Sequence, residues 1–307
     1  MPEDYTNAPE AGSPLGGLSA TISSFDWLKL PGAARAIARV VIGAGEAVSS
    51  WTDVITAKGE QAAQTIRDTT HARSRALTAM TEAAIRNAKK DPALVTRAIH
   101  YLVDEQISKQ ENREAVAAEA VRVLEEFPSN PATPSPDDDW LNIFIAQAEK
   151  ASSDRARKHW ARILAGEIKN PGSFSLMTIN LLAVIDQRLA QIIEQARGWI
   201  VQDDHIAITK SFRKGDLYSK LLALDAIGFL RMGSAKFIPA PKGQVIYYVG
   251  NRTIFYSCDR EITYHAAILT LAGRELIKII PAVTDDTIVA EAVELMVSRG
   301  ATALPRP

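Results

Sequence analysis

The fold is most clearly predicted by residues 153–175, which read SDRARKHWARILAGEIKNPGSFS. Ser153 and Asp154 supply polar groups that cap the start of a helix, and the helical pattern runs to about Ile168. The tight turn Asn-Pro-Gly-Ser then ends this helix, and a further helical pattern follows directly. Because short connections of this kind join antiparallel helices, the middle of the chain is predicted to be a helical domain over 139–200.

The helix predicted at 154–168 has two faces of different chemistry. Its apolar face carries Trp160, Ile163, Leu164 and Ile168. At about 100° per residue, a basic stripe falls on the opposite face. This stripe consists of Arg155, Lys158, Arg162 and Lys169. Such a stripe is usually the solvated side of an amphipathic helix, and the alternative is that its arginine and lysine side chains contact phosphate groups.

Two charged residues of the same helix, Arg157 and Glu167, fall on its apolar side. A charge directed into a core is costly unless it is paired. We therefore expect each of them to have an opposite-charge or backbone partner on a neighbouring helix, as part of a structural polar network. A buried polar switch is the alternative.

Four segments precede this helical domain. Residues 129–138 are a proline-rich linker, and residues 91–128 form a helix that begins at Asp91-Pro92, an N-cap followed by proline at the first helical position. Residues 31–90 are predicted to form an arm that is rich in small residues and consists of an amphipathic helix and a long helix. Residues 1–30 are predicted to be a flexible tail.

The apolar residues of the arm recur at helical spacing but form only a thin seam. Between residues 53 and 90 the balance of basic and acidic side chains is 7 − 4 = +3. A long helix with so little apolar surface cannot bury much alone, so it needs a partner from the same chain or from another copy. The residues predicted to make oligomer or membrane contacts are Trp27, Ile37, Val40, Val41, Val48, Trp51, Ile66, Leu77 and Met80.

The helical pattern at 37–48 leaves three alternatives open. The helix packs in the core or against another subunit, or it lies in a membrane interface with Trp27 and Trp51 as anchors, or the segment is poorly ordered. Its small residues allow close helix packing in an oligomer and in a membrane alike, so they do not separate the first two.

The C-terminal segment, residues 201–307, changes from helical to mixed periodicity. A helical pattern at 216–227 is followed by strand-like runs separated by turn residues, which predict a small antiparallel hairpin. Helices followed by a hairpin resemble a winged-helix arrangement. The predicted fold class is therefore mainly α, with helical N-terminal and middle regions and a small α+β, winged-helix-like module at 201–307.

The sequence contains no glycine-rich phosphate loop, no His-Glu-x-x-His and no Cys-x-x-Cys. Asp203-Asp204-His205 is the strongest catalytic candidate, because a carboxylate beside a histidine can relay protons or bind metal, but a polar loop is the ordinary explanation. The carboxylate of Asp259 is expected to raise the pKa of the neighbouring Cys258 thiol and so to make it less reactive. The sequence therefore predicts no catalytic residues, no cofactor and no metal site.

The composition is that of a globular protein, with 47% hydrophobic and 23% charged residues. The net charge of −1 gives the protein no global attraction to nucleic acid or anionic lipid. The single cysteine fits a reducing compartment, and neither a signal-peptide pattern nor an apolar run of spanning length is found. The expected location is the cytoplasm, with peripheral binding to the inner membrane as the alternative.

Several segments resemble a family of bacterial proteins known only as a domain of unknown function. The strongest likeness lies in WARILAGEI at 160–168 and PGSFS at 171–175, with looser likeness in DWL at 139–141, KQEN at 109–112 and LTLAGREL at 269–276. Lys109 and Glu111 depart from the family pattern. The resemblance implies no catalytic residues, and the accessory character of the family's genes implies a part in stress response or defence against phage.

Two functional hypotheses follow. The first is a non-catalytic, self-assembling helical sensor or effector that forms a homo-oligomer and acts at the inner membrane through its arm. The second is a nucleic-acid-binding regulator, in which the winged-helix-like module and the basic stripe contact phosphates. The residues expected to do so are Arg155, Lys158, Arg162, Arg213, Lys214 and Lys220. A partner protein encoded in the same operon is compatible with both.

Overall fold

The computed structural model describes residues 30–42, 92–126, 130, 132–240 and 242–305, without the side chains of 92 and 234–240. The described chain divides into two compact units, 1–173 and 174–307. The boundary lies within the segment 139–200, which the sequence predicts to be one helical domain. The helices after residue 174 thus belong to the unit that contains the sheet.

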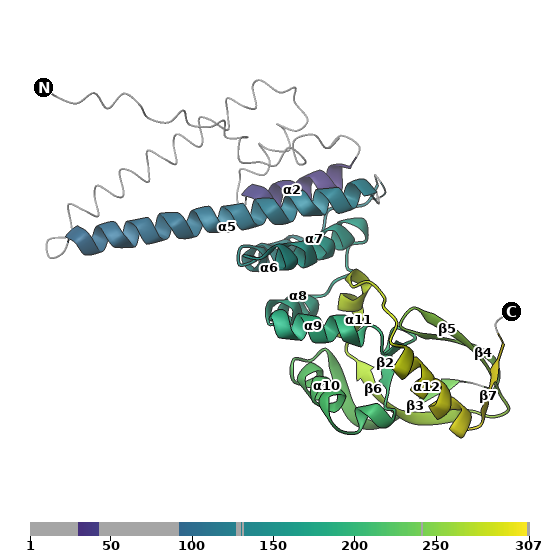
Figure 1. Ribbon diagram of the computed structural model, residues 1–307. Helices are drawn as coiled ribbons and strands as arrows, with labels where there is room; N and C mark the ends of the chain where they lie inside the picture. The colour runs from purple at the N-terminus through teal and green to yellow at the C-terminus, as the bar shows by residue number, and fades with distance from the viewer. Residues whose placement is uncertain (1–29, 43–91, 127–129, 131, 241, 306–307) are drawn as a thin grey trace, which may run out of the picture. The chain divides into compact units, whose positions relative to one another are not determined.

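The first unit is a bundle of helices with one long member (Figure 1). Its described helices are α2 (Pro31–Ile42), α5 (Pro92–Glu126), α6 (Asp138–Ala148) and α7 (Asp154–Lys169). Asp137 caps α6 and Ser153 caps α7 through their side-chain oxygens, as the sequence predicts for α7. The N-terminal ends of both helices are therefore fixed by the side chains of the residues that directly precede them.

Aromatic side chains fill the centre of this bundle. The rings of Trp140 and Phe144 on α6 are stacked 5.1 Å apart, and Trp160 of α7 meets Phe144 edge-on at 5.5 Å. Small residues make the rest of the packing close. Gly32 has no room for a side chain, because an added Cβ would lie 2.4 Å from the carbonyl oxygen of Thr133. These contacts fix α2 and the start of α6 in the same core.

The second unit is a seven-stranded antiparallel sheet with helices packed against it (Figure 1). The strand order is β3-β6-β2-β1-β4-β5-β7. The strands are β1 (Ile200–Val201), β2 (His205–Ala207), β3 (Leu230–Ala240), β4 (Gly243–Val249), β5 (Arg252–Cys258), β6 (Ile262–Leu269) and β7 (Ala301–Leu304). The helices are α8 (Leu176–Ala183), α9 (Gln187–Ala196), α10 (Asp216–Ala226), α11 (Leu271–Leu276) and α12 (Asp286–Ser298), with short 3-10 turns η2 (Lys210–Phe212) and η3 (Ile277–Ile279).

This sheet corrects the winged-helix prediction for residues 201–307. The predicted hairpin exists as β4 and β5, but it is the middle of a much larger sheet. Of the other strands, the sequence indicates only part of β3, as a strand-like run at 236–238. The strands β1, β2 and β6 escape notice because β1 and β2 are only two and three residues long and wholly buried, and β6 buries residues on both faces. None of them shows the alternation of apolar and polar residues that marks a half-buried strand.

The core of the second unit lies between one face of the sheet and α12. Tyr247, Tyr256 and Tyr264 contribute its largest side chains, and Ala292 and Met296 of α12 pack on them. On α11, an added Cβ at Gly273 would lie 2.0 Å from the carbonyl oxygen of Phe229, so only glycine fits this close approach. None of the helices in the described residues is long and apolar enough to cross a membrane.

Candidate assembly surface

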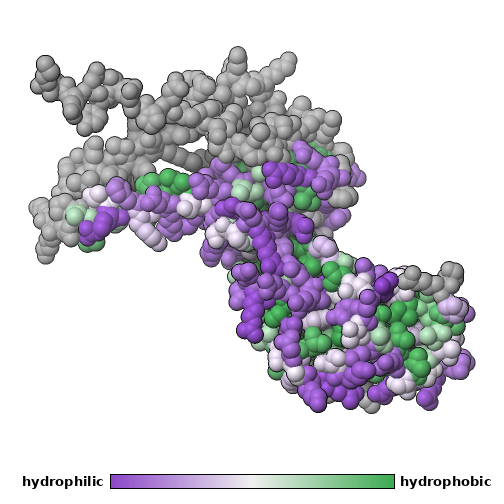
Figure 2. Space-filling view, viewed as in Figure 1, coloured by the Kyte–Doolittle hydropathy of each residue, from purple (hydrophilic) through white to green (hydrophobic). Residues whose placement is uncertain are grey.

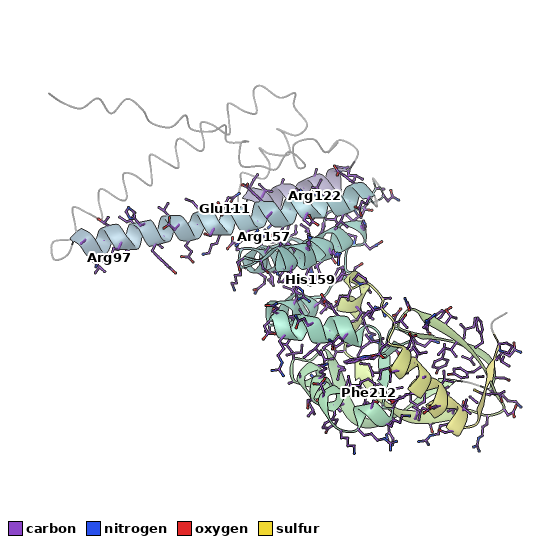
Figure 3. The ribbon with its side chains drawn as sticks, in the orientation of Figure 1. Arg97, Glu111, Arg122, Arg157, His159 and Phe212 are labelled. Atoms are coloured by element: carbon purple, nitrogen blue, oxygen red, sulfur yellow. The ribbon has the colours of Figure 1, made fainter. Side chains whose placement is uncertain are left out.

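The long helix α5 is buried over only half of its length. Asn112 is its first buried residue, and from there Val116, Val121 and Leu124 are completely covered by the bundle. We call residues 92–109 the projecting half of α5, and none of the residues 93–109, whose burial the structure describes, is buried. In Figure 3 the labelled Arg97 lies near the free end of this half, well away from Arg122 in the bundle.

The projecting half exposes large apolar side chains to an unusual degree. Figure 2 shows apolar residues along it, among hydrophilic ones. Its four most exposed apolar residues are Leu94 (57% exposed), Tyr101 (67%), Leu102 (55%) and Ile107 (52%). Isolated exposed apolar residues are ordinary, but a concentration within fourteen residues of one helix makes this segment a candidate interaction surface.

These side chains lie on two opposite sides of the helix. At about 100° per residue, one side carries Val95, Ile99, Leu102, Val103 and Ile107, which we call the apolar stripe. The stripe continues the line of Ala117, Ala120, Val121 and Leu124, which face the core further along α5. Leu94 and Tyr101 lie on the other side. A helix that is apolar on both sides requires neighbours on both.

A group of polar side chains marks the point where α5 leaves the bundle. The Gln110 amide donates to the carbonyl oxygen of Val41 (2.9 Å), at the end of α2, and the Asn112 amide donates to that of Glu149 (2.8 Å), at the end of α6. The guanidinium of Arg157 donates to the Asn112 side chain (2.9 Å) and to the carbonyl of Ala151 (3.0 Å). The group thus satisfies carbonyls that helix ends leave without partners.

The two charged residues on the apolar side of α7 therefore have separate partners. Arg157 bonds as described above and also lies 3.3 Å from Asp154, while the carboxylate of Glu167 accepts a bond from the backbone N–H of Gly172 (2.6 Å). In the second unit the Glu275 carboxylate likewise accepts hydrogen bonds, from the backbone N–H and the hydroxyl of Ser175. These carboxylates hold turns and helix starts in place.

Three of the apolar residues predicted to make oligomer or membrane contacts lie among the described residues. Ile37, Val40 and Val41 are buried in α2, inside the bundle of the first unit. The remaining predicted contact residues, Trp27, Val48, Trp51, Ile66, Leu77 and Met80, lie outside the described residues.

The basic residues proposed as phosphate contacts are divided between the two units. On α7, Lys158 is exposed, whereas Arg155 and Arg162 are half-buried and engaged in other interactions. In the second unit, Arg213 and Lys214 are exposed, and the Lys220 amine is paired with Asp216 at 2.7 Å. Phosphate binding by these residues stays a prediction.

The structure brings the side chains of Asp204 and His205 together, although they are consecutive in the sequence. His205 Nδ1 bonds to the Asp204 carboxylate, and its Nε2 lies 2.7 Å from the Tyr264 hydroxyl. The turn before them places Gln202 and Asp203 at φ values of 53° and 58°, an uncommon backbone conformation for residues other than glycine. His205 is completely buried, so no substrate reaches its ring in this conformation.

Burial is the largest influence on the pKa values of His205 and Tyr264. It lowers the pKa of His205, which the nearby Asp204 partly offsets, and it raises the pKa of the Tyr264 hydroxyl. Burial also raises the pKa of the Cys258 thiol, and Asp259 adds to that effect. Among the described residues, no three His, Cys, Asp or Glu side chains converge to hold a metal ion.

The buried His205 predicts a pH dependence of stability. Its pKa is lowered from 6.5 in the folded protein, so the unfolded chain takes up the proton first as the pH falls. Stability should therefore decrease below about pH 6.5, by at most about 1.4 kcal/mol per pH unit from this residue. Urea unfolding of the protein and of His205→Gln at pH 7.5 and 5.5 measures it. Equal pH dependence in both would contradict the prediction.

A model of the family described as "Protein of unknown function (DUF2806)" matches residues 96–291, well over half of the chain. This match confirms the predicted likeness to an uncharacterised family. No curated protein and no solved structure matches the sequence. The matched region begins at Thr96, so it includes most of the projecting half of α5 and the exposed residues Tyr101, Leu102 and Ile107.

Proposed function

We propose that this chain, which belongs to the DUF2806 family of proteins of unknown function, is a non-catalytic helical protein that assembles with copies of itself. In this proposal the copies associate through the projecting half of α5, and assembly is the event by which the protein acts as a sensor or effector in bacterial stress response or defence. The observation that supports it is the exposure of Leu94, Tyr101, Leu102 and Ile107 on one short helical segment.

The physical argument concerns the free energy of exposed apolar surface. Burying a large apolar side chain contributes about 1.5–3 kcal/mol, and four of these side chains lie more than half exposed on residues 92–109. A second copy offers the same surface in return, which is the usual way in which soluble proteins form symmetric dimers. Leu94 and Tyr101, which lie opposite the stripe, are the two most exposed of the four and are therefore the first to be tested.

The non-catalytic part of the proposal is supported by where the reactive groups lie. His205 and Cys258, the two candidates for chemistry, are both buried, and their hydrogen-bond and pKa environments do not activate them. Binding of the N-terminal arm to a membrane surface stays a prediction, because most of the residues expected to make that contact lie outside the described residues.

The test replaces both opposite-side residues, as Leu94→Ser with Tyr101→Ser, and compares assembly with that of the unmodified chain. We expect the dissociation constant between copies to rise at least about tenfold, since each tenfold step corresponds to 1.4 kcal/mol and two apolar contacts are lost. Sedimentation velocity over a range of concentrations measures this.

The matched control is Val184→Ser with Val297→Ser, which removes two similarly exposed apolar side chains from the second unit. The control should assemble like the unmodified chain. The proposal would be wrong if the α5 variant kept its full tendency to assemble, or if the control lost it to the same extent.

A further inference from the structure

One side of the projecting half of α5 is exposed along its whole length. At about 100° per residue, the positions on this side lie within about 60° of Tyr101. They are Leu94, Arg97, Ala98, Tyr101, Asp104, Glu105 and Ser108, which we call the Tyr101 face. All of them except Glu105 are exposed, whereas Val95, Ile99 and Val103 of the apolar stripe are half-buried. The Tyr101 face is therefore the more open side of this segment, which extends beyond α2, α6 and α7 (Figure 1).

Charge is divided unevenly along the Tyr101 face. Its N-terminal part carries the positive Arg97, and its C-terminal part carries the negative Asp104 and Glu105. In a parallel pair of identical helices in register, each of these charges lies beside the same charge of the other copy. In an antiparallel pair the two ends are exchanged, so Arg97 of each copy lies beside acidic residues of the other. Because such flanking charges set partner choice and orientation in paired helices, the face is complementary to a second copy that runs antiparallel.

The length of the projecting half determines where such a pair is centred. Tyr101 lies midway between Pro92, where α5 begins, and Gln110, where it meets α2, because 101 − 92 = 110 − 101 = 9. With a twofold axis at Tyr101, Pro92 of each copy is level with Gln110 of the other. The two helices then overlap over about 27 Å and stop where the bundle begins. Tyr101, at the centre, is also the most exposed large apolar residue of the described chain, at 67%.

The same register pairs particular residues. Leu94 of one copy is level with Ser108 of the other, and Tyr101 meets the second copy's Tyr101 on the axis. A twofold axis keeps equivalent flanks on one side, and Arg97 lies on the same flank as Asp104. Glu105, on the other flank, forms an ion pair with Lys109 of its own helix at 2.9 Å.

We propose that two copies of the chain pair antiparallel along their Tyr101 faces, with two Arg97–Asp104 ion pairs between the copies, one on either side of the axis. This inference rests on the proposed function and names the arrangement of the copies. A contact of this kind uses the same surface of both copies and closes on itself, so its product is a dimer rather than a filament. The apolar stripe takes no part in it.

Disulfide crosslinking of the full chain tests the orientation. Two variants are prepared in a Cys258→Ala background, one with Leu94→Cys and one with Ser108→Cys, and they are oxidised mildly, each alone and as an equal mixture. A disulfide needs Cα atoms within about 7 Å. In the antiparallel pair, positions 94 and 108 of different copies are level, whereas the two copies of position 94 are about 21 Å apart along the helix. We expect a disulfide between 94 and 108 in the mixture and little crosslinking of either variant alone, as identified by peptide mapping.

The other crosslinking results overturn the proposal. Disulfides in each variant alone, without a 94–108 product in the mixture, would show a parallel pair. No disulfide in any sample would show that another part of the chain, or another partner, covers this face. Sedimentation velocity of the unmodified chain separates these failures from failure of the proposed function. Dimers without the 94–108 product overturn the orientation alone, whereas a single-chain mass at every concentration overturns both.

Charge reversal provides a second test with an internal rescue. At low salt, Arg97→Glu and Asp104→Arg should each raise the dissociation constant between copies about tenfold, because two ion pairs become like-charge contacts. Arg97→Glu combined with Asp104→Arg should restore it to within about twofold of the unmodified chain. Arg188→Glu, which reverses an exposed charge on α9, is the matched control and should change nothing. Single variants without effect, or a double variant that is not rescued, would overturn the proposal.

Discussion

A chain shortened to begin at Asp91 is expected to lose the fold of its first unit. The reason is that α2 is part of that unit's core: Ile37, Val40 and Val41 are buried against the rest of the bundle. Burial of such side chains contributes about 1.5–3 kcal/mol each, so the loss of three approaches the whole stability of a small domain, about 5–15 kcal/mol.

The measurement is far-UV circular dichroism during thermal unfolding. The chain beginning at Asp91 should lose helical signal at low temperature, whereas a chain beginning at Leu30, which keeps α2, should unfold like the full-length protein. Identical unfolding curves for both shortened chains would show that α2 does not contribute to this core.

Replacing Trp160 with alanine is expected to destabilise the first unit by about 3–5 kcal/mol, the range for loss of a large buried aromatic side chain. Its indole ring is buried and meets Phe144 edge-on, and Phe144 in turn stacks on Trp140, so the change leaves a cavity beside the central ring of the three. The surrounding helices cannot fill that space without moving.

Urea unfolding of the full chain measures the change in free energy. Ile143→Ala serves as the control, because Ile143 is on the neighbouring α6 but is partly exposed, and its loss should cost much less. A change below about 1 kcal/mol for Trp160→Ala would contradict the core described above.

The parts of the fold that local chemistry determines could be predicted from the sequence. Ser153 caps α7 and the turn after Lys169 ends it, and the hairpin of β4 and β5 follows from its turn residues. Strands that have neither turn residues beside them nor an alternation of apolar and polar residues could not be predicted. Ile200 and Val201 make a two-residue strand that exists only because β2 and β4 lie beside it.

The candidate assembly surface could also be predicted only in part. The apolar residues of α5, among them Leu102 and Ile107, are visible in the sequence as a helical pattern, but the pattern does not tell a buried face from an exposed one. Only the position of Asn112, where the bundle begins, reveals that the stripe continues beyond its partners. The pairing of Asp204 with His205, which the sequence singles out as a candidate, depends on the turn at Gln202 and Asp203, whose backbone conformation the sequence does not indicate.

The central claim is that the projecting half of α5 makes this protein assemble, and the mass of the unmodified chain in solution tests it most directly. Sedimentation equilibrium at several concentrations should give a mass that is a multiple of the 33.4 kDa of one chain and that falls towards it on dilution. A mass of one chain at every concentration, up to the highest at which the protein is soluble, would contradict it.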